Sequence, residues 1–556
     1  MNCIGTDVNK IGFQHWRGDL FGGLTAAVVA LPLALAFGVA SGAGAIAGLY
    51  GAVISGFFAS LFGGTPAQVT GPTGPMTVII TTVIGGLMAR HPETGLAMAF
   101  TVVMIGGLVQ IAFGLLRLGQ YITMMPYTVI SGFMSGIGVI IILLQMPPLL
   151  GYQSSGGIWG TLHQMPTYLR QPNLAAVGLG LFTLGMVSLA PSRLNRILPT
   201  PLLALVISTV VSMLLAPEAV PRIGTIPTGL PTINLPTFAL ADLRTMLGYG
   251  LMLGVLGSID SLLTSLVADN LTRTQHKSDK ELIGQGIGNC LAGLCGGLPS
   301  AGATMRTVTN VQAGGRTPLS GMIHALTLLV ITLWAAPLTT TIPHAVLSGL
   351  LLKVGLDIID WSFIKRAPRL SRKATGLMYL VLALTVFVDL ITAVLVGVFI
   401  ANLLTIKRLT DVQSDRIRAV SDSEAAAGLS AAEQFLLNQA QGNILLFQLG
   451  GALSFGAAKT MAQRMSIVKN YQVMVLDLSD VPVLGVTAAL AIETIVEDSV
   501  RQQRHTFIVV TPGQPRRRLS KLDLDRFARA HLVENRLQAL QQAAALIPST
   551  PSAAKR

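Results

Sequence analysis

Two stretches of the sequence decide how it can fold: GGTPAQVTGPTGPMTVII at residues 63–80 and GGLPSAGATMRTVTN at residues 296–310. Both begin with Gly-Gly-x-Pro and continue through small residues and threonines. Each lies among hydrophobic segments that are long enough to cross a bilayer. Two apolar regions about 230 residues apart are therefore interrupted in the same way, which suggests two related halves.

Composition places most of the chain in a membrane. Hydrophobic residues make up 51% of the 556 residues and charged residues 11%, whereas soluble globular proteins carry roughly 25% charged residues. The net charge of +13 is scattered over span ends and the C-terminal tail, so it does not indicate nucleic-acid binding. The sequence contains no catalytic triad, metal-binding spacing or phosphate-binding loop. We expect an integral membrane protein that contacts lipid, binds no nucleic acid and is not an enzyme.

Apolar windows of about 20 residues, the length of a spanning helix, recur from Leu20 to Thr405. We predict 14 spans as two sets of seven. They lie near residues 20–39, 45–62, 71–87, 95–116, 122–150, 174–191, 200–216, 245–270, 282–296, 302–313, 318–337, 341–360, 374–391 and 391–406. Basic residues concentrate in the even-numbered connections, which predicts a cell (inner) membrane protein with both termini cytoplasmic.

The C-terminal region has a different pattern. The apolar segments NILLFQLGGALSF, YQVMVLDLSD and HTFIVVTP alternate with amphipathic helical segments, which is typical of a small α/β domain. We therefore predict a cytoplasmic N-terminal segment (1–18), a transmembrane domain (19–408), a linker (409–441), the α/β domain (442–546) and a tail (547–556).

The two Gly-Gly-x-Pro stretches predict broken helices with a binding site between them. In hydrocarbon, irregular backbone is tolerated only inside protein or along a wet cavity, and proline pushes the preceding residue toward extended geometry. We expect extended pieces at residues 69–72 and 299–302, followed by helices that start near Thr73 and Thr304. Free N–H groups and a positive dipole end at each helix start favour an anion. Paired interruptions point to a transporter's binding site rather than to simple kinks.

Asp260 adds a second candidate feature. It lies deep in a predicted span, in LGSIDSLLTSLVAD, and a carboxylate at bilayer depth is a candidate functional residue. Thr264 follows four residues later on the same helix face. Together with backbone carbonyls freed between Gly302 and Thr304, these oxygens would suit a small hard cation. The alternative is that Asp260 only caps a helix or forms a salt bridge within the bundle.

The sequence resembles the SulP (SLC26) family of anion transporters over nearly its whole length. The matching stretches include PTGPMTV, GLAMAFTVVM, MMPYTVISGFMSGIG, SLVADNLTRTQH, GQGIGN, AGATM and VLDLSDVPVLGVTAAL. Within the family it resembles the cyanobacterial sodium-dependent bicarbonate transporters in particular. The resemblance implies an α-helical membrane domain built as a seven-plus-seven inverted repeat with core and gate domains, and a C-terminal cytoplasmic STAS domain. It also implies a homodimer through the STAS and membrane domains.

The resemblance implies roles for single residues. The positions that hold bicarbonate match Thr73 and Ala303. The positions that bind sodium match Asp260, Thr264, Gly302 and Thr304. Sodium is the expected coupling ion and no other cofactor is expected. We also expect replacement of Thr73 to weaken anion binding without touching the cation ligands.

Arg306 leaves the transported anion open. Many sulfate-type members carry Gln and Tyr where this chain has Leu33 and Phe37, which favours the bicarbonate-type pocket. Arg306, however, matches an arginine common in other branches of the family, so it is a candidate anion contact. It could point at the anion and favour a divalent one, pair with Asp260, or turn away toward another polar group.

The resemblance therefore implies secondary active transport of an inorganic anion, with sodium-dependent bicarbonate uptake by symport and alternating access as the expected activity. The alternative is transport or exchange of sulfate or another anion, with proton coupling or with none.

Overall fold

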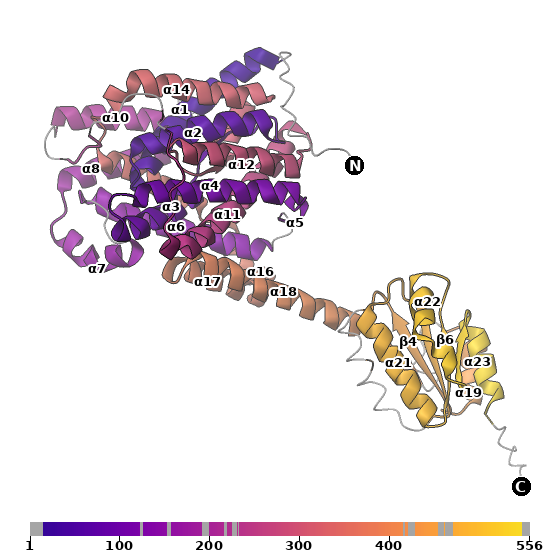
Figure 1. The fold of residues 1–556 in the computed structure, drawn as a ribbon. Coiled ribbons are helices and arrows are strands. Elements are labelled where there is room, and N and C mark those ends of the chain that lie inside the picture. The colour runs from indigo at the N-terminus through magenta and orange to yellow at the C-terminus, as the bar shows by residue number, and fades with distance from the viewer. Residues whose placement is uncertain are drawn as a thin grey trace, which may run out of the picture. The chain divides into compact units, whose positions relative to one another are not determined.

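The computed structural model describes residues 15–122, 126–152, 157–191, 199–215, 220–224, 231, 233–414, 417–420, 429–453, 461 and 471–547. The chain divides into two compact units, Met1–Phe399 and Ile400–Arg556. The first unit is a bundle of helices, and the second is a sheet with helices on both faces (Figure 1).

The helices of the first unit follow the predicted spans closely, except the last one, which runs to Ser414, beyond both the predicted end at residue 406 and the boundary between the two units. Its first half contains α1 (Trp16–Ser41), α2 (Ala45–Phe62), α3 (Gly74–Arg90), α4 (Gly95–Leu115), α5 (Gly119–Ile122), α6 (Tyr127–Leu149), α7 (Gly157–Arg170), α8 (Leu174–Leu189) and α10 (Thr200–Leu215). A 3-10 turn, η2 (Leu240–Asp242), leads into the second half. That half contains α11 (Leu243–Thr272), α12 (Ser278–Leu294), α13 (Thr304–Gln312), α14 (Pro318–Thr339), α15 (His344–Ile358), α16 (Trp361–Leu370), α17 (Arg372–Phe387) and α18 (Leu390–Ser414). Helices α7 and α16 lie between predicted spans.

Several of these helices have the length and composition of membrane spans. In the part of the chain that the structure describes, five helices meet both criteria, and a pair bent by 113°, α7 with α8, makes a sixth candidate. The apolar helices α3 and α10 and the apolar part of α14 (Pro318–Trp334) are shorter, and α3 follows directly on the first interrupted segment. The prediction of 14 spans stays a prediction.

Glycines let α12 approach α4 closely. A Cβ atom built on Gly286 would lie 2.5 Å from the carbonyl oxygen of Gly107, and one built on Gly107 would lie 2.6 Å from the carbonyl oxygen of Gly286. Only glycine fits at both positions, which is the small-residue packing common between membrane helices. This contact fixes α12, which carries several of the polar side chains described below.

The second unit is the predicted α/β domain. Its sheet has the order β3-β4-β5-β6-β7, in which β3 is antiparallel to β4 and the remaining neighbours are parallel. The strands are β3 (Ile417–Val420), β4 (Ile444–Gly450), β5 (Val473–Asp480), β6 (His505–Val509) and β7 (Ala530–Val533). The helices are α19 (Ala431–Gln439), α21 (Val486–Arg501), α22 (Gln514–Leu519) and α23 (Arg536–Ala545), with 3-10 turns η4 (Ser520–Leu522) and η5 (Leu524–Arg526).

Two apolar layers hold this domain together, because successive side chains along a strand point to opposite faces. One layer lies between the sheet and α21 and includes Leu445, Phe447, Leu476 and Ile492. The other lies between the sheet and helices α19 and α23 and includes Leu446, Val475, Leu437 and Leu540.

The segment 409–441 has more structure than a polar linker. It contains β3, which pairs with β4, and α19, which packs on the sheet. A capping box starts α19: Ser430 Oγ accepts a hydrogen bond from the backbone N–H of Glu433, whose side chain accepts one from the backbone N–H of Ser430. Sequence composition alone did not indicate these elements, because β3 is short and the residues around it are polar.

An ion-pair network joins α19 to the C-terminal helix. Arg536 donates from Nε to Glu433 at 2.8 Å and from Nη1 to Asp477 at 3.1 Å. Burial by itself raises the pKa of Glu433, but the hydrogen bonds from Arg536 and Ser430 hold this pKa below its usual range. The network therefore stabilises the folded domain when the carboxylates are ionised.

Replacing Arg536 with methionine should destabilise this domain. The side chains of Glu433 and Asp477 are 7% and 5% exposed, so both carboxylates would lose their partner at a buried site. We expect the free energy of unfolding to fall by about 2–4 kcal/mol. Hydrogen–deuterium exchange of the full-length protein should then be faster in α19 and β5.

The control is Arg501→Met, which removes an exposed ion pair with Glu497 whose side chains are 72% and 40% exposed. Such pairs contribute less than about 1 kcal/mol, so exchange should be unchanged. The Arg536 effect should also disappear at low pH. Because the pKa of Glu433 is lowered on folding, its contribution is present above the ordinary value of 4.5 and is lost as the pH falls through the folded value. Equal exchange in both variants at neutral pH would contradict this assignment.

Candidate functional site

The two interrupted segments meet as a pair of short strands. β1 (Thr70–Pro72) and β2 (Ser300–Gly302) are antiparallel, with Thr70 opposite Gly302 and Pro72 opposite Ser300. The backbone N–H of Ala303 extends the pairing by donating to the carbonyl of Val69 at 2.9 Å. The predicted extended pieces are confirmed. The sequence did not predict that they hydrogen-bond to each other.

Both predicted helix starts are also confirmed. α3 begins at Gly74 after Thr73, and α13 begins at Thr304 after Ala303. Thr73 and Ala303 have extended backbone conformations, and neither helix has a side-chain cap on its first N–H groups. Two uncapped helix N-termini therefore follow directly from the paired strands, as an anion site without formal charge requires.

Helix α12 supplies further hydrogen-bond partners of the strand pair. Asn289 donates to the carbonyl of Ser300 at 2.8 Å and accepts from its backbone N–H at 2.8 Å. One turn earlier, Gln285 donates to Thr70 Oγ1 at 2.6 Å. Sequence reasoning missed both roles. Their four-residue spacing in GQGIGN was the available signal, because it places two amides on one face of a helix.

Three of the four predicted cation ligands contact one another beside the strand pair, and the fourth, Asp260, lies nearby on α11. Thr264 donates to the carbonyl oxygen of Gly302 at 2.9 Å, and its Oγ1 lies 2.8 Å from Oγ1 of Thr304. Asp260 lies one turn before Thr264 on α11. A carboxylate, two hydroxyls and a backbone carbonyl form an oxygen-only donor set, which fits a hard cation and not a soft one.

These residues differ in exposure. Thr264, Gly302 and Ala303 are buried, Thr73 and Asp260 are half-buried, and Thr304 is exposed. The site therefore has buried residues on one side and an accessible face on the other. An ion needs such an accessible face in order to enter and leave.

One expectation about Thr73 is wrong. Its hydroxyl was expected to serve the anion separately from the cation ligands, but Thr73 Oγ1 donates to Asp260 Oδ2 at 2.9 Å. Because Thr73 is also the residue before the first turn of α3, it lies between the carboxylate and a helix N-terminus. The two predicted subsites therefore share this hydrogen bond.

Arg306 takes the third of the three predicted orientations. Its guanidinium is buried, with 1% of the residue exposed, and Nη2 donates to the carbonyl of Pro72 at 3.0 Å. The side chain lies against Gly71, where a Cβ atom would be 2.1 Å from Nη1. Among the ion pairs of the described residues, none joins Arg306 to Asp260. Arg306 thus holds α13 to the end of β1.

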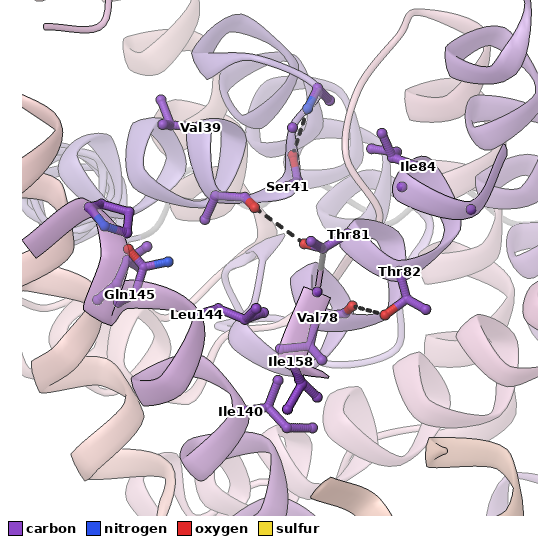
Figure 2. A pocket seen from close by; sticks show the side chains of 18 of the residues that line it. Val39, Ser41, Val78, Thr81, Thr82, Ile84, Ile140, Leu144, Gln145 and Ile158 are labelled. Carbon is purple, nitrogen blue, oxygen red and sulfur yellow. Dashed lines mark hydrogen bonds between the residues drawn. The ribbon is translucent and has the colours of Figure 1, made fainter. Parts of the chain in front are cut away.

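A cavity of about 1320 Å³ lies elsewhere in the bundle (Figure 2). Residues of α1, α3, α6 and α7 line it, together with residues of α2, α11, α15, α17 and α18. Its polar lining includes Ser41, Thr82, Gln145 and Thr81, which donates to the carbonyl of Ala40 at 3.4 Å. Within the described part of the chain, the lining includes none of the predicted ion-binding residues and no lysine or arginine. The cavity reaches Val78, one turn after the start of α3. It therefore approaches the paired strands β1 and β2, but no residue of these strands lines it.

Comparisons with known proteins agree with this architecture. Residues 16–381 match the sulfate permease family, and residues 436–539 match the STAS domain. The chain is 54% identical over 538 residues to the bicarbonate transporter BicA of Synechocystis sp., covering 96% of this chain and 95% of that protein. It is 53% identical over 524 residues to BicA of Picosynechococcus sp., covering 93% and 92%.

Solved structures show the same fold. The transmembrane domain of a cyanobacterial BicA matches with a TM-score of 0.66 and 58% identity, over 69% of this chain and 99% of that one. The structure of SLC26A9 matches with a TM-score of 0.83 over 96% of this chain and 91% of that one, and at 17% identity it supports the fold alone. The paired broken spans, the helical membrane unit and the C-terminal STAS domain thus place this chain in the sulfate permease family of anion transporters.

Proposed function

We propose that this protein takes up bicarbonate together with sodium, as a symporter of the cell membrane that works by alternating access. The observation that carries the proposal is the cluster of Asp260, Thr264, Thr304 and the Gly302 carbonyl beside two helix N-termini. The identity of 53–54% to two proteins named bicarbonate transporters supports the choice of anion.

Electrostatics gives a physical reason for coupling. An ionised Asp260 repels an anion held at the start of α3, and the hydrogen bond from Thr73 shows how near that position is. A sodium ion among the oxygen ligands would neutralise the carboxylate. Anion binding would then no longer oppose the charge of Asp260, so each ion raises the affinity for the other.

The bonding of Arg306 favours a monovalent anion. Its hydrogen bond to Pro72 and its burial keep this charge in the protein framework, so the anion meets helix dipoles and Thr73 and not a fixed cation. The second candidate function is transport or exchange of sulfate, which the unbonded Nη1 of Arg306 would support if it turned toward the substrate. Proton coupling through Asp260 is the alternative to sodium.

We further propose the inner membrane as the location, cytoplasmic termini, and a homodimer formed through the STAS and membrane domains. The basic even-numbered connections support the orientation. The family resemblance supports the dimer.

Asp260→Asn should reduce sodium-driven uptake to background while the protein remains folded and inserted, because a neutral amide cannot offset the charge of sodium. The measurement is uptake of labelled bicarbonate into proteoliposomes at alkaline pH, with and without a sodium gradient. A pH-gradient arm separates sodium coupling from proton coupling. Asp269→Asn, near the end of the same helix, is the control and should keep sodium dependence. Unchanged sodium dependence in Asp260→Asn would refute the cation site.

Thr73→Ala should weaken the apparent affinity for bicarbonate by about 10- to 100-fold, since a hydrogen bond to a charged group contributes about 1.5–3 kcal/mol. The one hydroxyl proton of Thr73, which is donated to Asp260 in this structure, would turn to the anion once sodium neutralises the carboxylate. Thr73→Ser keeps the hydroxyl and should stay near wild type. Because Thr73 also bonds to Asp260, a smaller change in sodium affinity is expected. Normal bicarbonate affinity in Thr73→Ala would mean that the first broken span is only a kink.

Arg306→Met should keep sodium-driven bicarbonate uptake and lower thermal stability, because it preserves much of the buried volume but removes the bond to Pro72. Methionine is a better replacement than glycine for this test, because glycine would leave a cavity where the Arg306 side chain is buried. The measurements are uptake and the melting temperature of the purified protein. Loss of bicarbonate uptake by a stable variant, or preferred uptake of sulfate by wild type, would favour the second candidate function.

A further inference from the structure

We propose that Glu281 is a positioning residue for the cation site and acts through Gln68 on the backbone of Gly302. The inference rests on the proposed sodium coupling and deepens it. Glu281 forms its hydrogen bonds to residues outside the predicted ion-binding set, and it lies on a different helix from Asp260.

Glu281 is buried at the start of α12, with 2% of the residue exposed, and donors surround its carboxylate. Oε2 accepts from the backbone N–H groups of Gly64 and Thr65, both at 2.8 Å. Oε1 accepts from the side-chain amides of Gln68 and Gln285, both at 2.8 Å. A carboxylate has two acceptor oxygens and no donor, so it matches all four partners, whereas an amide cannot.

This arrangement fixes the orientation of the Gln68 amide. Its nitrogen donates to Glu281, and its oxygen accepts from Ser265 Oγ at 3.0 Å. The amide lies directly against Gly302, where a Cβ atom would be 2.3 Å from Gln68 Nε2. Gly302 therefore cannot move toward Gln68, and no larger residue fits at its position.

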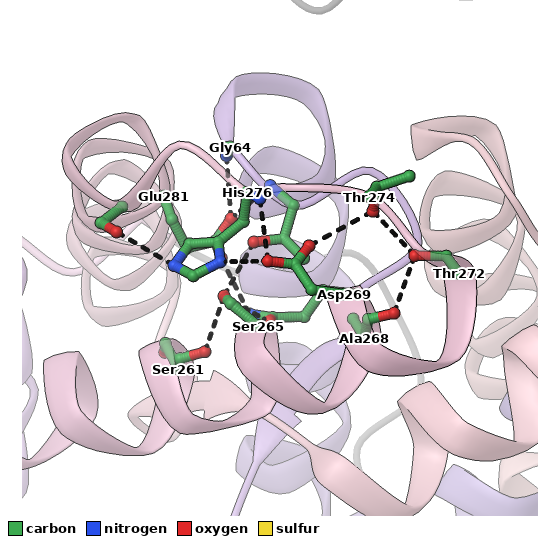
Figure 3. Close-up of polar contacts among 12 residues, drawn as sticks. Gly64, Ser261, Ser265, Ala268, Asp269, Thr272, Thr274, His276 and Glu281 are labelled. Carbon is green, nitrogen blue, oxygen red and sulfur yellow. Dashed lines mark hydrogen bonds and ion pairs between the residues drawn. The ribbon is translucent and has the colours of Figure 1, made fainter. Parts of the chain in front are cut away.

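Helix α11 also holds Gly302. The backbone N–H of Gly302 donates to Ser261 Oγ at 3.0 Å, and the Gly302 carbonyl accepts from Thr264, a predicted sodium ligand. Ser261 and Ser265 lie one turn apart on α11, and Figure 3 shows them below Glu281 and Gly64. The Gly302 carbonyl is thus fixed between an amide oriented by Glu281 and the helix that carries Asp260.

The test is Glu281→Gln in the full-length protein. The new amide must direct its NH₂ group either at the two backbone donors, which releases Gly64 and Thr65, or at the two side-chain amides, which releases Gln68. Either way, the set of four hydrogen bonds that orients Gln68 is broken. We expect the apparent sodium affinity to fall by about 10-fold or more, the usual effect of losing a residue that orients a metal ligand. The bicarbonate KM at saturating sodium should change much less than the sodium affinity, because Thr73 lies at the far end of the segment that Glu281 holds. Sodium affinity is measured from the sodium-dependent rise in Tm of the purified protein, and separately from uptake.

A charge swap separates positioning from simple structural support. In Glu281→Gln combined with Gln68→Glu, the oxygen of the amide introduced on α12 can accept from Gly64 and Thr65 while its NH₂ group donates to the new carboxylate. Sodium affinity should therefore recover in the double variant relative to Glu281→Gln, as a double-mutant cycle. The matched control is Asp279→Asn, in the same turn of α12, whose carboxylate accepts from Gly119 N–H at 3.0 Å. It should keep wild-type sodium affinity.

Three results would overturn the proposal while wild type keeps its sodium response. They are unchanged sodium affinity in Glu281→Gln, a parallel loss of sodium and bicarbonate affinity, and failure of the double variant to recover. If wild type itself shows neither a sodium-dependent Tm shift nor sodium-driven uptake, the proposed coupling fails and this inference fails with it.

Discussion

The membrane unit depends on one constraint: extended backbone at bilayer depth must find its hydrogen bonds within the protein. β1 and β2 meet this constraint by pairing with each other, and side chains of α11, α12 and α13 complete the backbone hydrogen bonds. Because the strands are antiparallel, α3 and α13 leave the pair from opposite ends. The same pairing that satisfies the backbone thus places an uncapped helix N-terminus at each end of one short strand pair.

Two buried charges hold the first interrupted segment in position. Glu281 accepts the N–H groups at its beginning, and Arg306 donates to the carbonyl of Pro72 at its end. Both side chains come from the second half of the chain. Burying a charge is costly unless it is hydrogen-bonded. Here each charged side chain bonds to backbone groups that lie outside a helix and so lack helical hydrogen-bond partners. This explains how a segment rich in glycine and proline keeps one conformation.

The hydrogen bond from Thr73 to Asp260 connects the parts of the site that differ in charge. The carboxylate belongs to α11 and the hydroxyl to the start of α3, so the two halves of the chain contribute to one site. A change in the charge of Asp260 therefore directly changes the electrostatic potential at the start of α3, where we propose that an anion binds. Through such a contact, the binding of one ion can change the affinity for the other without a conformational change between two distant sites.

The sequence by itself determined the membrane class, the approximate bounds of most membrane helices and the positions of both broken spans, since these follow from hydrophobic length and from the local geometry of glycine and proline. It also indicated Asp260 and Thr264, because a carboxylate in an apolar helix is exceptional and a four-residue spacing defines one face. Only the tertiary structure decided that the broken spans pair, that Arg306 bonds to Pro72, and that Glu281 orients Gln68 against Gly302. These contacts join residues more than 200 positions apart, and no local periodicity encodes which distant donor meets which acceptor.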